Sequence, residues 1–86
     1  RRWTGAILRA LLDGTSRFTD IAARIPELSD RMLSERLKEL ESEGIVRREV
    51  VPETPVRVVY HLTDKGRALE PAITEIAVWA EAWLDP

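Results

Sequence analysis

The side chains with the clearest chemistry lie on one stretch, residues 29–44, with the sequence SDRMLSERLKELESEG. Its three leucines recur at i, i+4 and i+7, which predicts a helix with one buried face. Ser29 is suited to cap the start of this helix and Gly44 to end it. The side chains left on the other face are polar, namely Arg31, Ser34, Glu35 and Lys38. This face is free to meet a polar partner.

That polar face has the chemistry of a DNA reader. Arg31 lies in the first helical turn, where its guanidinium could bond a guanine edge in bidentate fashion, a contact worth about 1–3 kcal/mol of base discrimination. Ser29 and Thr19, at two predicted helix starts, could offer donors to phosphates. Three arginines, Arg47, Arg48 and Arg57, flank the later proline loop. Arg57, together with Arg47 or Arg48, would contact the DNA backbone or the minor groove. The candidate DNA-binding residues are therefore Thr19, Ser29, Arg31, Ser34, Glu35, Lys38, Arg47, Arg48 and Arg57.

A plainer interpretation stands beside this one, because an amphipathic helix with Arg, Glu and Lys on its exposed side is usually just solvated. Glu35 and Glu39 could pair with Arg31 and Lys38 at helical spacing. Arg36 lies near the edge of the buried stripe, which favours a structural ion pair over contact with DNA. The order of the surrounding elements is what favours the functional interpretation.

The rest of the chain predicts a winged helix-turn-helix. Residues 1–14 carry apolar side chains at helical spacing and predict a first helix. Residues 19–44 predict two helices joined by a turn at Pro26, the first capped by Thr19, after a link over 15–18 that includes a stub of strand. Residues 45–62 alternate apolar and charged residues on either side of PETP and predict a hairpin, the wing. Residues 63–84 predict a last helix capped by Thr63, with a kink or restart at Pro71. The predicted fold class is α+β, mainly α: one domain, 1–86, with a three-helix core, a β-hairpin wing and a C-terminal dimerisation helix.

The last helix carries more apolar side chains than one small core can cover. Leu69, Ile73, Ile76, Ala80 and Trp83 step by four, three, four and three, like the seam of a coiled coil. A second copy related by two-fold symmetry is the simplest cover. The candidate dimer-interface residues are Trp3, Ile73, Ile76, Trp79, Ala80 and Trp83.

Charge and composition bear on the partner. The formal net charge is −2, but residues 70–86 hold four carboxylates and no Lys or Arg, so the other 69 residues sum to +2. This asymmetry suits a protein that meets an anionic partner on one side. The overall negative charge also supports an alternative function, a winged-helix protein-interaction module that does not bind DNA.

The sequence offers little for catalysis, metals or membranes. It has no cysteine and one histidine, His61, in a predicted strand, so neither a typical zinc site nor a nucleophile with its base can be assembled. We expect no catalytic residues, no metal, no cofactor and no enzyme activity. No apolar run approaches the roughly 20 residues of a membrane span and no signal pattern opens the chain, so we expect a cytoplasmic protein. The chain starts at Arg1 without Met, and we expect an upstream segment to be missing.

The segments RWTGAILRALLDG, RFTDIAARIPELSDRMLSERLKELESEGIVRREV and PETPVRVVYHLTDKG resemble, in order and spacing, those of the HxlR-type regulators, winged-helix transcription factors related to MarR. The resemblance covers essentially the whole chain. It implies a homodimer that binds double-stranded DNA at a pseudo-palindromic operator near a promoter. The identity of any small-molecule effector stays open. It also implies a groove-reading face and a wing contact, made by Arg31, Ser34, Glu35, Lys38 and Arg57.

Two departures from the family pattern affect these expectations. Family members often have a second proline where Val56 stands and an acidic residue where Val59 stands, so the wing here is expected to be less rigid or tilted. Many relatives sense oxidants through a cysteine upstream of Arg-Trp-Thr. Thiol sensing is not assigned to this chain.

Overall fold

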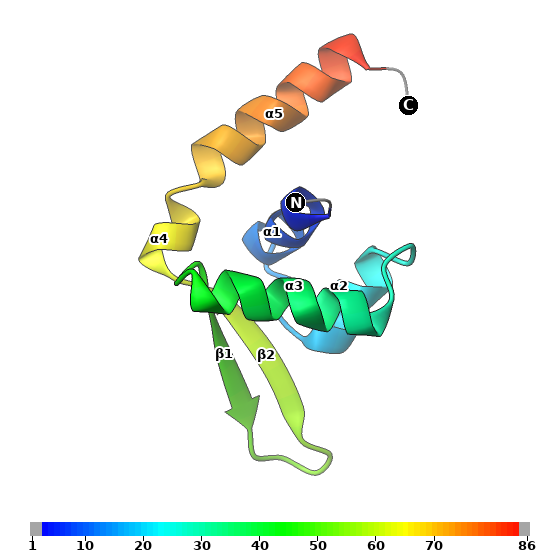
Figure 1. Cartoon of the computed structure of the whole chain (residues 1–86), viewed down its shortest axis with the longest axis vertical. Coiled ribbons are helices and arrows are strands. Elements are labelled where there is room, and N and C mark those ends of the chain that lie inside the picture. Colours follow the sequence, from blue (N-terminus) through cyan, green and yellow to red (C-terminus); the bar gives the residue numbers. More distant parts are fainter. Residues whose placement is uncertain (1–2, 85–86) are drawn as a thin grey trace.

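The computed structural model describes residues 3–84 as a three-helix body from which a hairpin and a last helix project at opposite ends (Figure 1). Arg2 of the Arg-Trp-Thr motif and Asp85 of the acidic tail lie outside the described residues. The molecule is elongated, with principal extents of 45 × 27 × 20 Å. The elements are α1 (Thr4–Leu12), α2 (Phe18–Arg24), α3 (Asp30–Ser42), β1 (Val46–Val51), β2 (Arg57–Leu62), α4 (Asp64–Arg67) and α5 (Glu70–Trp83).

The core lies where the first three helices meet the root of the hairpin. Its most deeply buried large side chains are Ile7 of α1, Ile21 of α2, and Leu33 and Leu37 of α3. Apolar burial drives this packing, because each fully buried Leu or Ile contributes about 1.5–3 kcal/mol relative to an exposed one. The predicted winged helix-turn-helix with a three-helix core is confirmed.

Helix α3 begins and ends as its sequence predicts. Ser29 Oγ accepts a hydrogen bond of 3.1 Å from the amide of Met32, which satisfies one of the free donors of the first turn. At the other end Gly44 adopts φ 74°, a left-handed conformation that glycine takes without strain. The amide of Ile45 then donates to Leu40 O at 2.9 Å and closes the helix.

Helix α2 begins one residue before Thr19, so the prediction that Thr19 caps it is wrong. The residue before the helix is Arg17, in extended conformation and without a side-chain cap. Its conformation is set from elsewhere in the chain: Arg17 pairs with Val59 in an isolated β-bridge, and Ser16 O accepts from the amide of Tyr60 at 2.8 Å. The predicted stub of strand is therefore present, and because of it the helix begins earlier in the sequence than predicted.

The two wing strands pair antiparallel, from Val46 opposite Leu62 at the root to Val51 opposite Arg57 at the tip. The two strands are packed unequally, because β1 is exposed from Arg47 to Val50 whereas β2 stays half-buried or buried. Val46, Tyr60 and Leu62 are buried, but Val50 is exposed. The alternation of apolar and charged residues therefore does not correspond to one buried and one exposed face along the whole hairpin. The outer part of the hairpin extends beyond the body (Figure 1).

The predicted last helix is two helices. Thr63 Oγ1 caps α4 by accepting from the amide of Gly66 at 3.1 Å, but this helix ends at Arg67. Helix α5 restarts at Glu70 with Pro71 in its first turn, where a missing amide costs nothing. The predicted restart is confirmed. None of the residues of α5 is buried in the single chain.

The stability of this fold should depend on the leucine stripe of α3. Leu37 has no exposed surface, so Leu37→Ala is expected to lower the free energy of unfolding by about 2–5 kcal/mol. Val56→Ala, in the exposed wing loop, is expected to change it by no more than about 0.5 kcal/mol. Urea unfolding followed by circular dichroism measures both, and equal effects would contradict the assigned core.

Candidate nucleic-acid interface

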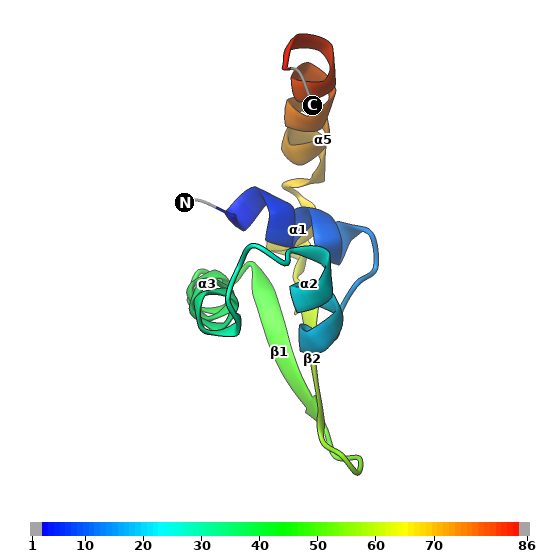
Figure 2. The same cartoon turned by 90° about the vertical axis from the view of Figure 1, so that its right-hand side faces the viewer.

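A groove of about 590 Å³ lies between the start of α2, the outer face of α3 and the wing. Figure 2 shows how this arises: α2 and α3 flank the root of the hairpin, and the strands continue past them. The groove is lined by Arg17, Phe18, Thr19, Ser34, Lys38, Glu41, Arg48, Val56, Arg57, Val58 and Tyr60. Three elements that are distant in sequence thus share one concave surface.

Helix α3 presents a polar stripe to this groove. Ser34, Lys38 and Glu41 recur at i, i+4 and i+7, so they lie on one side of the helix, next to the buried leucines. The serine supplies a hydroxyl, the lysine an ammonium and the glutamate a carboxylate. The stripe can therefore donate and accept hydrogen bonds along one line.

The groove is positively charged although the chain is not. Its cations are Arg17, Lys38, Arg48 and Arg57, against the single carboxylate of Glu41. Arg57 is held by Glu53 of the wing loop, with Nη2 2.9 Å from Oε1. The other three cations make no ion pair within residues 3–84. They are available to an anion in the groove.

Five of the nine predicted DNA-binding residues are brought together here. They are Thr19, Ser34, Lys38, Arg48 and Arg57. The hairpin resolves the choice between Arg47 and Arg48, because adjacent strand residues point to opposite faces. Arg48 is opposite Tyr60, and both line the groove, whereas Arg47 is opposite His61 on the other face.

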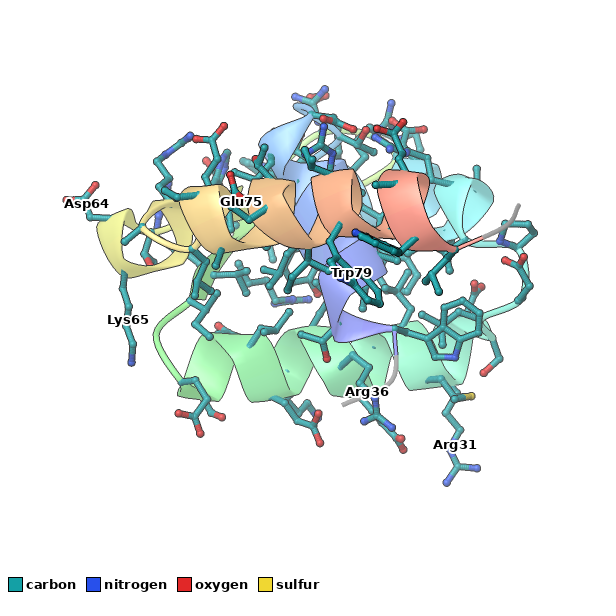
Figure 3. All side chains as sticks on the ribbon, turned by 90° about the horizontal axis from the view of Figure 1, so that it is seen from above. Arg31, Arg36, Asp64, Lys65, Glu75 and Trp79 are labelled. Atoms are coloured by element: carbon teal, nitrogen blue, oxygen red, sulfur yellow. The ribbon has the colours of Figure 1, made fainter. Side chains whose placement is uncertain are left out.

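Ser29, Arg31, Glu35 and Arg47 lie outside the groove lining. Arg31 is at the first turn of α3 and its side chain is 89% exposed, with Nε 3.5 Å from Glu35 Oε1. Figure 3 shows it at the end of α3, pointing away from the body. The hydroxyl of Ser29 is engaged in capping its own helix.

The predicted ion pairs of α3 are present in part. Arg31 pairs with Glu35 as expected, but Glu39 pairs with Arg36 and not with Lys38. The Arg36 side chain is only 15% exposed and its Nη1 lies 3.2 Å from Glu39 Oε1, which fits the structural role predicted for it. The ammonium group of Lys38 is therefore available to a ligand in the groove.

Arg17 is the groove residue that the sequence did not reveal. Its side chain is exposed at the entrance between α2 and the wing. The only signal was its place just before a helix start, and that signal was lost because the start was assigned to Thr19. Glu41 was also missed, and it is the one acidic group in the lining.

Within residues 3–84, no three His, Asp or Glu side chains are grouped as metal ligands. His61 Nε2 lies 2.7 Å from Glu49 Oε1 on the surface of the wing. None of the helices in this part is long and apolar enough to cross a membrane.

Three of the six predicted dimer residues form an exposed apolar surface on α5, and Trp3 and Ile73 pack partly against the core. Ile76, Trp79 and Trp83 are 67%, 54% and 74% exposed, while Trp3, Ile73 and Ala80 are half-buried. Seen from above, Trp79 projects from the side of α5 that is turned toward α3 (Figure 3). Exposed tryptophans gathered on one helix are typical of a surface that another molecule covers.

Comparison with known proteins agrees with this geometry. The family model described as HxlR-like helix-turn-helix matches residues 1–86. In Bacillus subtilis, the HTH-type transcriptional regulator YvaP is 58% identical over 86 residues, which are all of this chain and 80% of YvaP. The HTH-type transcriptional regulator YodB is 50% identical over 86 residues, which are 77% of its length.

Solved structures share the fold. The reduced form of YodB superposes with a TM-score of 0.83 at 49% identity, over all of this chain and 84% of the YodB chain. The redox regulator HypR in its oxidised form superposes with a TM-score of 0.91 at 37% identity, over all of this chain and 89% of that chain.

Proposed function

The chain belongs to the HxlR-like helix-turn-helix family of transcriptional regulators, and we propose that it binds a pseudo-palindromic DNA operator as a homodimer. The single observation that carries the proposal is the cationic groove, where α3, the start of α2 and the wing converge. These are the three places at which a winged helix meets a duplex. We place this activity in the cytoplasm.

In the proposed complex, α3 enters the major groove, which is about 12 Å wide and admits one helix. The stripe of Ser34 and Lys38 then faces base edges and phosphates, and Arg31 reaches a base beyond the first turn. The Arg31 side chain is almost fully exposed, so it can exchange Glu35 for guanine at little cost, since an exposed ion pair contributes only about 0.2–1 kcal/mol.

The wing and the start of α2 hold the duplex from its two sides. Arg48 lines the groove from β1, Arg57 lines it from the wing tip, where it also borders the opposite face, and Arg17 lines it from just before α2. Phosphate contacts of this kind position a protein without reading sequence. Affinity therefore comes from these arginines in two copies, while α3 supplies selection.

Regulation follows from where the operator lies. A dimer bound near a promoter either excludes or recruits polymerase, and a signal acts by changing the separation of the two α3 helices. HypR, whose structure shares this fold, is a redox regulator. The 86 residues of this chain contain no cysteine, so we propose no thiol chemistry for them.

Base selection is tested with Arg31→Ala. Operators selected from a random DNA pool are compared with scrambled duplexes in a gel-shift titration. The variant is expected to lose about 1–3 kcal/mol of preference for the selected operator per guanine contacted. An equal loss on selected and scrambled DNA would contradict base reading by Arg31.

Phosphate contact is tested with a matched pair on one strand. Arg48→Ala should weaken binding to every duplex and lower the slope of log affinity against log salt by about one unit per half-site. Arg47→Ala removes the same charge one residue away on the opposite face, and it should change the slope much less. Identical slopes for the two variants would contradict the assigned face. Arg57→Ala is expected to behave like Arg48→Ala.

Dimerisation is tested by a second matched pair, on α5. Ile76 and Val78 are both exposed, 67% and 55%, but residues two apart point to different sides of a helix. Ile76→Asp should convert the dimer into the 9.8 kDa monomer, because an unpaired carboxylate is costly to bury. Val78→Asp should leave the dimer intact. Light scattering measures both masses, and unchanged mass in the first variant would refute this interface.

The same experiments distinguish the alternative function. A chain that stays dimeric but shows no salt-sensitive binding to duplex DNA at micromolar concentration would be a protein-interaction module. The net charge of −2 is the observation that keeps this alternative in view.

A further inference from the structure

Helix α4 is locked onto the C-terminal end of α3. Thr63 Oγ1 lies within hydrogen-bonding distance of Gly44 O and of Ile45 O, and the Thr63 amide donates to Ile45 O at 3.1 Å. Lys65 Nζ donates to Glu43 O at 2.7 Å. The carbonyl of the C-cap residue Glu43 and those of the next two residues, Gly44 and Ile45, thus accept hydrogen bonds from Thr63 and Lys65.

Electrostatics and close packing act together at this junction. The C-terminal end of a helix carries partial negative charge, which the ammonium of Lys65 complements. Gly66 is buried, and a Cβ at this position would overlap the carbonyl oxygen of Ile45. Only glycine allows the two backbones this approach. We call Thr63, Lys65 and Gly66 the α3–α4 lock.

The lock also determines where α5 points. Only Ala68 and Leu69 separate α4 from α5, and the Leu69 amide donates to Gly66 O at 3.1 Å. Leu69 and Ile73 pack against the core, but the rest of α5 extends away from the body (Figure 1). The direction of α5 relative to α3 is therefore set by the junction at α4 together with the packing of Leu69 and Ile73 on the core.

We infer that the α3–α4 lock sets the distance between the two α3 helices of the dimer and so selects the spacing of operator half-sites. The inference rests on the proposed function, in which α5 joins the two copies. The 14 residues of α5 are about 21 Å long. A rotation of about 10° at the junction would move a point about 20 Å away by about 3.5 Å, which matches the rise of about 3.4 Å per base pair.

These three residues are positioning residues, since nothing places them in the groove. A purely structural role would make their loss weaken binding to all DNA alike. A positioning role would change which spacing is preferred. Half-site spacing therefore separates the two roles.

The test uses duplexes with two half-sites at the selected spacing and at one base pair more or less. The wild-type chain is expected to prefer the selected spacing at least tenfold. Lys65→Met removes the hydrogen bond to Glu43 O and keeps the aliphatic stem, so this preference should fall at least threefold. Arg67→Met is the matched control: it removes the same charge from the same helix, its side chain forms no hydrogen bond or ion pair with α3 within residues 3–84, and the preference should be retained.

Two further variants make the outcome clear. Thr63→Val and Gly66→Ala should also lose spacing preference while single half-site affinity and the dimer mass stay within twofold of wild type. Lys65→Met keeps the test valid if Gly66→Ala does not fold. Spacing preference retained in Lys65→Met and Thr63→Val, or lost equally in Arg67→Met, would overturn the inference. Wild-type protein with no preference for inverted repeats over scrambled DNA would instead overturn the proposed function, and the inference with it.

Discussion

The burial of the leucine stripe on α3 determines how every polar side chain of that helix is used. Leu33, Leu37 and Leu40 face the core, and a helix with three buried residues on one side can be rotated in only one way. That rotation turns Ser34 and Lys38 into the groove and leaves Arg31 on the exposed edge. The functional face is therefore a consequence of the hydrophobic core.

Features that depend on neighbouring residues were predictable from the sequence. The cap at Ser29, the end at Gly44 and the restart at Pro71 each follow from local chemistry, and each is present. The winged helix-turn-helix itself was predictable because the apolar spacing changes from about 3.6 to 2 after α3. The α3 pairing of Arg31 with Glu35 follows from spacing as well.

Features that depend on residues distant in the sequence were not predictable from it. The start of α2 is set by the bridge between Arg17 and Val59, which are 42 positions apart, and propensity around Thr19 carries no trace of it. The choice between Arg47 and Arg48 needed the strand register and the side of the sheet that meets the core. Strand β1 is exposed on both faces from Arg47 to Val50, so its apolar pattern held no such information.

The net charge of −2 is a poor guide to this molecule because charge is separated in space. Three cations that make no ion pair within residues 3–84 face the groove, while the carboxylates of residues 70–84 lie on a helix that leaves the body in the opposite direction (Figure 1). At an ionic strength of 0.15 M the Debye length is about 8 Å, so an anion in the groove is largely screened from those carboxylates. An acidic chain can therefore present a cationic surface, provided that the fold keeps the two regions further apart than that length. The outward direction of α5 keeps them apart, so the same geometry that exposes its apolar side also protects the groove from its charge.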